Sequence, residues 1–156
     1  MKTAKNLCVL LAIAVCLVLF AGCRTETETV TVSAESYFDK LIIKNGKVYM
    51  VCSVEFVNDE DKPLNITVKG ESEEDVKNGL LTDGVLEFRV LNTDSVSAVS
   101  EENIEQLLEP AGPLTLEANG AARYCVCFIG SHGGGEQKHD RELPRIIISI
   151  EPSADQ

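Results

Sequence analysis

The chain has 156 residues, 25 acidic against 14 basic side chains, and a formal net charge of −11. This balance argues against nucleic acid as a partner and against adsorption of a folded surface onto anionic lipid. The length fits one domain, and the absence of tryptophan leaves its core to Val, Ile, Leu and Phe.

The N-terminal segment has a basic start, Lys2 and Lys5, followed by an uncharged run over residues 7–23, LCVLLAIAVCLVLFAGC. A basic start, an apolar middle and small residues at the end are typical of a secretory signal peptide. The run is also at the lower limit of the roughly 17–25 residues that a membrane-spanning helix needs. An uncleaved anchor therefore stays open as an alternative.

The end of this run, FAGC at residues 20–23, resembles the lipobox of bacterial lipoproteins, although that family prefers Leu at the position of Phe20. The resemblance implies that residues 1–22 are a signal peptide that is removed, and that Cys23 becomes the lipidated first residue. Two acyl chains hold a protein on a membrane, whereas one holds it only marginally. The domain would then face away from the cytoplasm, on the cell membrane or the outer membrane. Arg24 is not the aspartate that signals inner-membrane retention in proteobacterial lipoproteins.

Removal of the signal peptide would leave 134 residues and, with two lysines lost, a net charge of −13. Residues 23–36, CRTETETVTVSAES, predict a lipidated cysteine followed by a flexible tether, because Glu–Thr repeats are usually solvated. Within it, TVTVSA at residues 29–34 has the alternative of joining a sheet edge. We expect the folded domain over residues 37–152 and a C-terminal tail over 153–156.

The clearest local signal is Asn45-Gly46 between LIIK and KVYMVCSVEFV, which predicts a type I′ hairpin turn. The second run alternates with a period of two, which predicts that one face packs on a core. The apolar face holds Val48, Met50, Cys52, Val54 and Phe56, and the other holds Lys47, Tyr49, Ser53 and Glu55.

The remaining strands are expected at residues 64–69, 85–91, 114–118, 121–129 and 145–151, with a loop or single helical turn at 70–79 and a helix starting at Ser100. About seven antiparallel strands and one short helix predict an all-β domain, an immunoglobulin-like β-sandwich. The layout of FVNDEDKPLNITV and LEANGAARYCVCFIG also resembles Ig-like modules of bacterial surface lipoproteins, a likeness that names no activity.

Three cysteines remain outside the signal peptide and the lipobox: Cys52, Cys125 and Cys127. A disulfide from Cys52 to Cys127, or to Cys125, is one reading. Alternation places Cys52 on the core face of its strand, whereas Cys125 and Cys127 share a face with Arg123 and therefore point outward. Three unpaired cysteines are thus expected ahead of a bridge.

The loop at residues 130–143, GSHGGGEQKHDREL, holds both histidines of the chain. Consecutive glycines allow backbone amides to approach an anion, and loops on a rigid scaffold often carry binding. The sequence matches neither a phosphate-binding GxxxxGK[ST] loop nor a GxSxG nucleophile elbow, and a solvated connection is the competing reading. The candidate binding residues are His132, Gly133, Gly134, Lys138, His139 and Arg141.

No metal and no other cofactor is expected. Zinc would need four convergent ligands, and His132 and His139 with Cys125 or Cys127 lack the spacing of known zinc sites. A calcium site at the acidic turn 58–61 lacks the glycine and the distal glutamate of an EF-hand.

The function predicted from these features is a non-catalytic binding or interaction domain of unknown ligand, held to the membrane by its lipid and able to bind another envelope or extracellular protein. Two alternatives are a small envelope hydrolase or metal-dependent enzyme using the 130–143 loop, and a structural spacer. Catalysis is not expected, because no nucleophile, base and orienting group stand out and Ser131 and His132 are merely neighbours.

Overall fold

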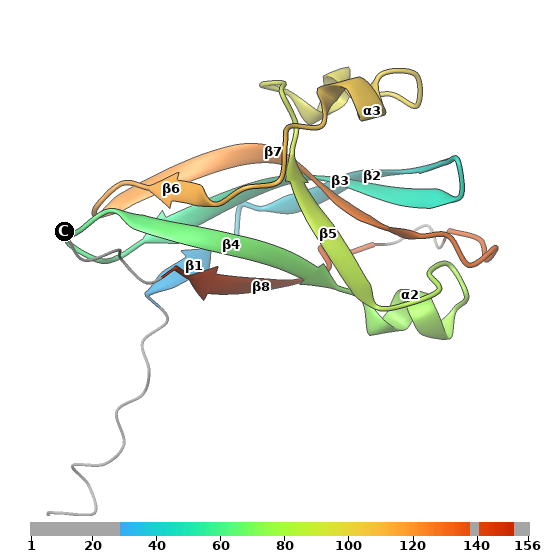
Figure 1. Cartoon of the computed structure of the whole chain (residues 1–156), viewed down its shortest axis with the longest axis horizontal. Coiled ribbons are helices and arrows are strands. Elements are labelled where there is room, and N and C mark those ends of the chain that lie inside the picture. The colour runs from blue at the N-terminus through green and yellow to red at the C-terminus, as the bar shows by residue number, and fades with distance from the viewer. Residues whose placement is uncertain (1–28, 138–140, 152–156) are drawn as a thin grey trace, which may run out of the picture.

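The computed structural model describes residues 29–137 and 141–151, and this part of the chain is dominated by strands (Figure 1). The all-β class predicted from the sequence is confirmed, with one strand more than the expected seven. The strands are β1 (Val30–Val32), β2 (Tyr37–Lys44), β3 (Lys47–Asn58), β4 (Leu64–Glu71), β5 (Val85–Val90), β6 (Leu114–Leu116), β7 (Gly120–Ser131) and β8 (Arg145–Ile150). The short helices are α2 (Glu73–Lys77), α3 (Ile104–Leu107) and a 3-10 turn at Val96–Ala98.

All eight strands belong to one antiparallel sheet, ordered β1-β3-β7-β5-β4-β6, with β2 also beside β3 and β8 also beside β4. The sheet curls, so that β2, β3 and β7 lie across from β4 and β8 (Figure 1). The expectation of an immunoglobulin-like sandwich required two separate sheets. Here β5 pairs with both β4 and β7 and makes the hydrogen bonding continuous between the two halves.

The predicted hairpin between β2 and β3 is confirmed. Asn45 and Gly46 both have positive φ, 52° and 72°, as a type I′ turn requires, and Lys44 pairs with Lys47 across it. Asn119, which lies between β6 and β7, also has a positive φ of 49°. These two strands do not form a hairpin, because β6 pairs with β4.

The inner face of the curled sheet holds the main core, and the predicted apolar face of β3 points into it. Its five members are each at most 1% exposed: Val48, Met50, Cys52, Val54 and Phe56. Phe88 and Phe128 also belong to this core and meet each other edge to face, with ring centroids 5.5 Å apart. Each large side chain buried here stabilises the fold by roughly 1.5–3 kcal/mol.

The opposite face of β3 is also buried in part, contrary to the expectation of an outer face. Tyr49 and Val51 are at most 1% exposed and form a second cluster with Cys127. The chain between β5 and β6, which contains α3, folds back over this side of the sheet (Figure 1) and inserts the fully buried Ile104. The alternation of residues along β3 identifies the two faces of the strand. It does not show that the segment around Ile104, far along the chain, covers the second face.

The strand β1 lies within the stretch assigned to the tether, so the sheet begins at Val30 and not at Tyr37. Val30 pairs with Asn58 and is only 6% exposed, because its side chain joins the inner core. The sheet-edge alternative for residues 29–34 is therefore right for these three residues. The signal peptide, Cys23 and the tail at 153–156 lie outside the described residues.

One of the two short helices differs from expectation at its start. α3 begins at Ile104 rather than after Ser100, because the side chain of Asn103 accepts a hydrogen bond from the Ser100 amide at 2.8 Å and holds a turn there. α2 is the single helical turn that the sequence left open against a loop. Among the described residues, no helix is long and apolar enough to cross a membrane.

Candidate binding groove

The glycine-rich loop that the sequence singles out packs tightly on the backbone before β5. The Gly133 amide donates to the Leu80 carbonyl at 2.8 Å and the Gly135 amide donates to the Gly79 carbonyl at 2.9 Å. A Cβ at Gly133 would lie 2.5 Å from the Gly79 oxygen, and one at Gly135 would lie 2.6 Å from the Gly79 carbonyl carbon. These glycines therefore permit a close approach of two backbones, and the two amides bind carbonyls rather than an anion.

The side chain of His132 also makes an internal contact, since its Nε2 atom lies 3.1 Å from the Gly135 carbonyl oxygen. Gly134 lies at the loop's tip with a φ of 90° and open space around it. Of the predicted binding residues, Lys138 and His139 lie outside the described residues.

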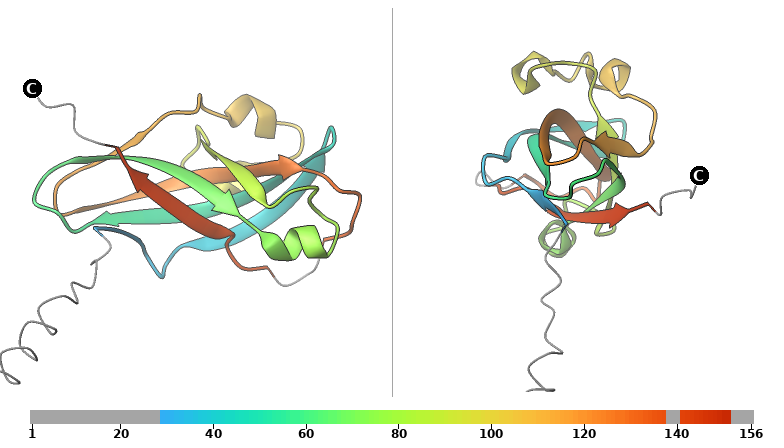
Figure 2. Two further views of the ribbon diagram at one scale, coloured as in Figure 1. Left: turned by 60° about the horizontal axis from the view of Figure 1, so that its bottom comes forward. Right: turned by 90° about the vertical axis from the view of Figure 1, so that its left-hand side faces the viewer.

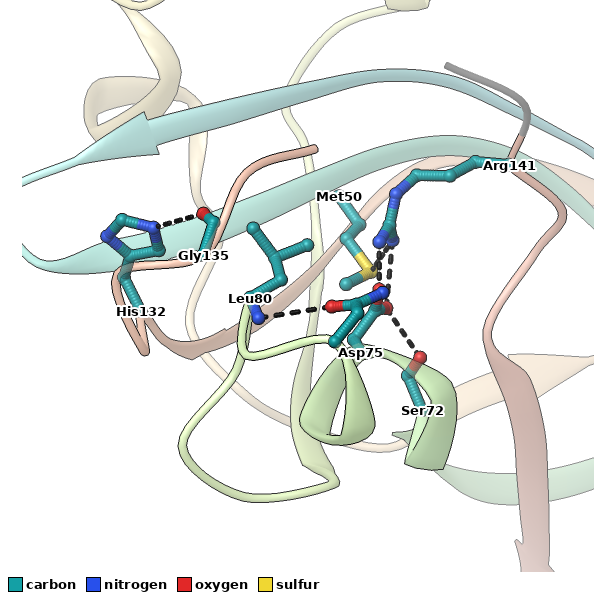
Figure 3. Close-up of polar contacts among 8 residues, drawn as sticks. Met50, Ser72, Asp75, Leu80, His132, Gly135 and Arg141 are labelled. Atoms are coloured by element: carbon teal, nitrogen blue, oxygen red, sulfur yellow. Dashed lines mark hydrogen bonds and ion pairs between the residues drawn. The ribbon is translucent and has the colours of Figure 1, made fainter. Parts of the chain in front are cut away.

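The structure does not bring Arg141 to His132. The two side chains lie on either side of Leu80 in Figure 3. Arg141 instead forms a buried ion pair with Asp75 of α2, their side chains being 8% and 5% exposed. One terminal nitrogen of Arg141 donates to Asp75 Oδ2 at 2.8 Å and the other donates to Oδ1.

Other contacts fix this pair in place (Figure 3). The Arg141 guanidinium lies 6.0 Å from the ring centroid of Phe38 and 3.8 Å from the sulfur of Met50. Its Nε atom is buried with no hydrogen-bond partner among the described residues. The Asp75 carboxylate also accepts from the hydroxyl of Ser72. Arg141 therefore has a structural role: its ion pair with Asp75 holds the chain before β8 against α2.

Burial alone would raise the pKa of Asp75, but hydrogen bonds from Arg141 and Ser72 outweigh it and hold the pKa below its ordinary value. Asp75 is consequently ionised at neutral pH and matches the guanidinium charge.

A hollow of about 790 Å³ lies beside this ion pair, between α2 and the chain leading into β8. Its lining holds six carboxylates and two guanidinium groups, and Lys40 and Lys77 pair with two of these carboxylates, so a smaller net negative charge remains. The carboxylates are Asp39, Glu71, Glu73, Glu74, Asp75 and Glu142, and the guanidinium groups are Arg141 and Arg145.

A second hollow of about 720 Å³ lies between β1 and β8. These two strands are edge strands of the curled sheet, and Figure 2 shows them close to each other. The lining of this hollow is mainly apolar: Val30, Val32, Leu143, Pro144, Ile146, Ile148 and Ile150, with Thr29 and Thr31. Leu143 and Pro144 line both hollows, so the two adjoin. We call them together the β1–β8 groove, with an acidic end beside α2 and an apolar end between the strands.

Both walls of the apolar end are open sheet edges. Among the described residues β8 pairs only with β4. The Glu151 amide donates to the Asn65 carbonyl at 2.8 Å, so the odd-numbered residues of β8 are the ones whose backbone groups bond to β4. Because hydrogen-bonded pairs alternate in an antiparallel ladder, Ile146, Ile148 and Ile150 direct their backbone N–H and C=O groups away from β4, toward the groove.

The same reasoning applies to β1, which pairs only with β3 in the described part of the chain. The Ser33 amide bonds to the Glu55 carbonyl at 2.9 Å, so the backbone groups of odd-numbered residues face β3. Those of Val30 and Val32 face the groove. Within residues 29–137 and 141–151, two unpaired edges therefore flank one apolar hollow.

The three cysteines among the described residues form no disulfide. Cys52, Cys125 and Cys127 are free. Cys52 belongs to the inner core and Cys127 to the cluster on the opposite face of the sheet. The possible Cys52–Cys127 bridge is therefore wrong and the face assignment by alternation is confirmed, although Cys127 is covered rather than exposed. Burial raises the pKa of the Cys52 thiol to about 12.

The acidic turn that was weighed as a calcium site is organised by Asn58, which is fully buried. The amide nitrogen of its side chain donates to the carbonyls of Lys62 and Glu117 at 3.0 and 2.9 Å, and its oxygen accepts from the Glu60 amide. No group of three or more His, Cys, Asp or Glu residues placed to hold a metal ion occurs in the described residues.

Comparisons with protein-family models, with characterised proteins and with solved structures find no match to this chain.

Sequence reasoning missed the β1–β8 groove. One signal was present, because TVTV and RIIISI are short apolar runs at the two ends of the domain. In the structure these two runs become edge strands of the sheet, β1 and β8. Their proximity depends on how strongly the sheet curls, which the pattern does not state.

Proposed function

We propose that this chain is a lipid-anchored envelope protein whose β domain is a non-catalytic binding module facing away from the cytoplasm. In this proposal residues 1–22 are removed, Cys23 carries the acyl chains, and the β1–β8 groove is the binding site. The lipobox-like FAGC after an uncharged run supports this membrane anchoring.

The observation that carries the binding role is the pair of open edges around an apolar hollow. An exposed edge strand rich in isoleucine tends to pair with a strand of another chain. Proteins usually prevent such pairing with charged residues, prolines or a segment that covers the edge. Here β8 has Arg145 at its first position and isoleucine at four of its six positions. A binding partner that covers this edge gives the exposed apolar surface a function.

The chain order places this groove near the proposed anchor. Val30, on one wall of the groove, follows Cys23 by seven residues. An extended chain spans at most about 3.6 Å per residue, so this wall lies within about 25 Å of the lipidated residue. The expected ligand is therefore another component of the same membrane surface or of the adjoining envelope.

The immunoglobulin-like sandwich stays part of this proposal at the level of architecture. The two halves of the sheet enclose one core between them, as the sheets of such sandwiches do. The continuous pairing through β5 departs from that arrangement.

The proposed lipid anchor is tested by measuring the intact mass of protein extracted from membranes. We expect a chain that begins at Cys23 and carries acyl groups, and we expect a Cys23→Ser variant to lack them and to leave the membrane fraction. A mass that begins at Met1 without lipid would show that the apolar run is an uncleaved anchor.

The binding role is tested by placing a photo-crosslinking amino acid at Ile150 in cells that produce the protein naturally. Val85 on β5 is the matched control, since both side chains are exposed, at 44% and 61%, and only Ile150 lines the groove. We expect a discrete adduct from position 150, identified by mass spectrometry, and none from position 85. No adduct from either position would favour the structural spacer instead.

A further inference from the structure

The free edge of β8 has the geometry that an added strand needs. Ile146, Ile148 and Ile150 present backbone donors and acceptors toward the groove at every second residue, a repeat of about 6.8 Å along an antiparallel strand. A polypeptide segment that lies along this edge continues the ladder. In this mode of recognition, backbone hydrogen bonds supply affinity and alternate side chains supply specificity.

The side chains along this edge specify what the added strand must carry. Ile146 and Ile148 are partly buried against the inner core, whereas Ile150 remains 44% exposed, and Val32 faces them across the gap. A strand between β8 and β1 directs every second side chain toward this apolar surface. Those positions favour Val, Ile, Leu or Phe, because apolar cross-strand pairs stabilise a sheet.

The second wall restricts the direction of the added strand. Successive strands alternate in direction along the path β1-β3-β7-β5-β4-β8, so β1 and β8 run antiparallel to each other. A strand inserted between them is antiparallel to one and parallel to the other. The antiparallel pairing is placed on β8, because β8 is the longer edge and antiparallel pairing is slightly more stable per residue.

The charge of the groove then gives the partner segment a polarity. β8 begins with Arg145 at the acidic end, so a strand antiparallel to β8 has its C-terminal end there. The six carboxylates at this end outnumber by two the following cations, each of which lies beside one of them: Arg141, Arg145, Lys40 and Lys77. A lysine or arginine on the C-terminal side of the partner segment complements this potential.

We propose that the occupant of the β1–β8 groove is an extended segment of another protein, which adds to β8 as an antiparallel strand. It carries apolar side chains at alternate positions and a basic residue toward its C-terminal end. This inference rests on the proposed function, since it identifies the partner of the same groove.

The chain's own terminal segments fit this description poorly. RTETE at residues 24–28 leads directly into β1 and holds two glutamates, and PSADQ at 152–156 has an aspartate and no base. In an antiparallel β8–β8 dimer, the partner's Arg145 would lie beside Ile150, at the end away from the carboxylates. A net charge of −11 per chain further opposes such a dimer at low salt.

The test begins with selection of random 12-residue peptides displayed on phage, with the mature protein as the target and Cys23→Ser replacing the lipid site. We expect the enriched peptides to share the alternation of apolar residues and the basic residue on the C-terminal side. The best peptide is then synthesised as the probe, and its dissociation constant is measured by calorimetry or fluorescence anisotropy.

The decisive variant is Ile148→Pro, because the Ile148 amide faces the groove and makes no bond to β4. A proline there removes one donor of the new ladder and obstructs the edge without breaking the existing one. We expect the probe to bind at least about tenfold more weakly. Ile148→Ala, which loses the same side chain but retains the amide, is the matched control, and we expect it to bind the probe at least about threefold more tightly than Ile148→Pro. Ile150→Pro repeats the test at a more exposed position if melting shows that Ile148→Pro is unfolded.

Replacement of the probe's basic residue by glutamine is expected to weaken binding at least about threefold and to abolish its salt dependence. If Ile148→Pro and Ile148→Ala bind the probe equally well, strand addition is wrong while a binding function can still stand. If no peptide is enriched, the proposal of strand addition is wrong. The binding function is then tested separately by the cross-linking at position 150. A dimer that Ile148→Pro abolishes, seen by sedimentation, would reassign the groove to a second copy of this chain.

Discussion

Arg141 and Asp75, 66 residues apart in the sequence, form a two-point ion pair that is almost completely buried. It joins the segment before β8 to α2, and so fixes the chain where the two hollows of the β1–β8 groove meet. Neither residue belongs to a recognisable motif, and the pair forms because β8 pairs with β4, which places the chain before Arg145 beside the start of α2 after Glu71.

Substitution of Arg141 by Met should destabilise the protein by about 3–5 kcal/mol, because the Asp75 carboxylate would stay buried without a counter-charge. The free energy of unfolding from urea denaturation measures this effect. A double variant, Arg141→Met with Asp75→Asn, should recover part of the loss, since it removes the unpaired charge.

The matched control is Arg145→Met, four residues further along the same segment. Arg145 is 78% exposed and its contact to Glu71 spans 3.5 Å, so this change should cost less than about 1 kcal/mol. Equal effects at positions 141 and 145 would contradict the structural role of the buried pair.

The ion pair should also make stability depend on pH in the acidic range. The pKa of Asp75 is lower in the folded protein than in the unfolded chain, where an aspartate titrates near about 3.9. The folded state therefore binds fewer protons, and this contribution is complete above that value and is lost as the pH falls through the lower, folded pKa.

Urea denaturation of the wild type and of the Arg141→Met, Asp75→Asn double variant, repeated from pH 7 down to pH 2, isolates this contribution. We expect the wild type to lose more stability than the double variant below about pH 4. Parallel losses across the whole range would show that Asp75 is not the group responsible.

The three free cysteines should differ in reactivity. Cys52 and Cys127 are 0% exposed, whereas Cys125 is half-buried. Burial raises the pKa of all three thiols and so disfavours the reactive thiolate in each. In the native protein we expect Cys125 to be alkylated first, and the other two to react only when the protein unfolds.

Mass spectrometry after timed alkylation without reductant measures this order. Alkylation of all three thiols after unfolding is expected. One alkylated thiol out of three under those conditions would reveal a disulfide and contradict the separation of Cys52 and Cys127 on opposite faces of the sheet.

The glycine-rich loop should tolerate an added methyl group at some positions and not at others. Gly135→Ala would place its Cβ against the backbone of Gly79 and should destabilise the protein by more than about 1 kcal/mol. Gly112→Ala is the control, since nothing lies within 4 Å of its Cβ position and its φ is not positive. Thermal melting compares them, and an equal melting temperature would contradict the tight packing of the loop.

The sequence by itself determined the local features. Alternation along β3 gave its core face, and Asn45-Gly46 gave the hairpin, because a period of two and a turn with two positive φ angles are properties of neighbouring residues. The same logic placed Cys52 and Cys127 on opposite faces. The class of fold followed from the number of such strands.

Only the tertiary structure decided which open edges and charges meet. The sequence predicts binding in the 130–143 loop, but Gly133 and Gly135 pack on the backbone at Gly79 and Arg141 is buried against Asp75. The cover over Tyr49, the strand at Val30 and the groove beside β8 all depend on how the sheet curls and on which distant segments fill its surfaces. Those outcomes are set by packing between residues far apart in the chain, whose mutual distance no local pattern encodes.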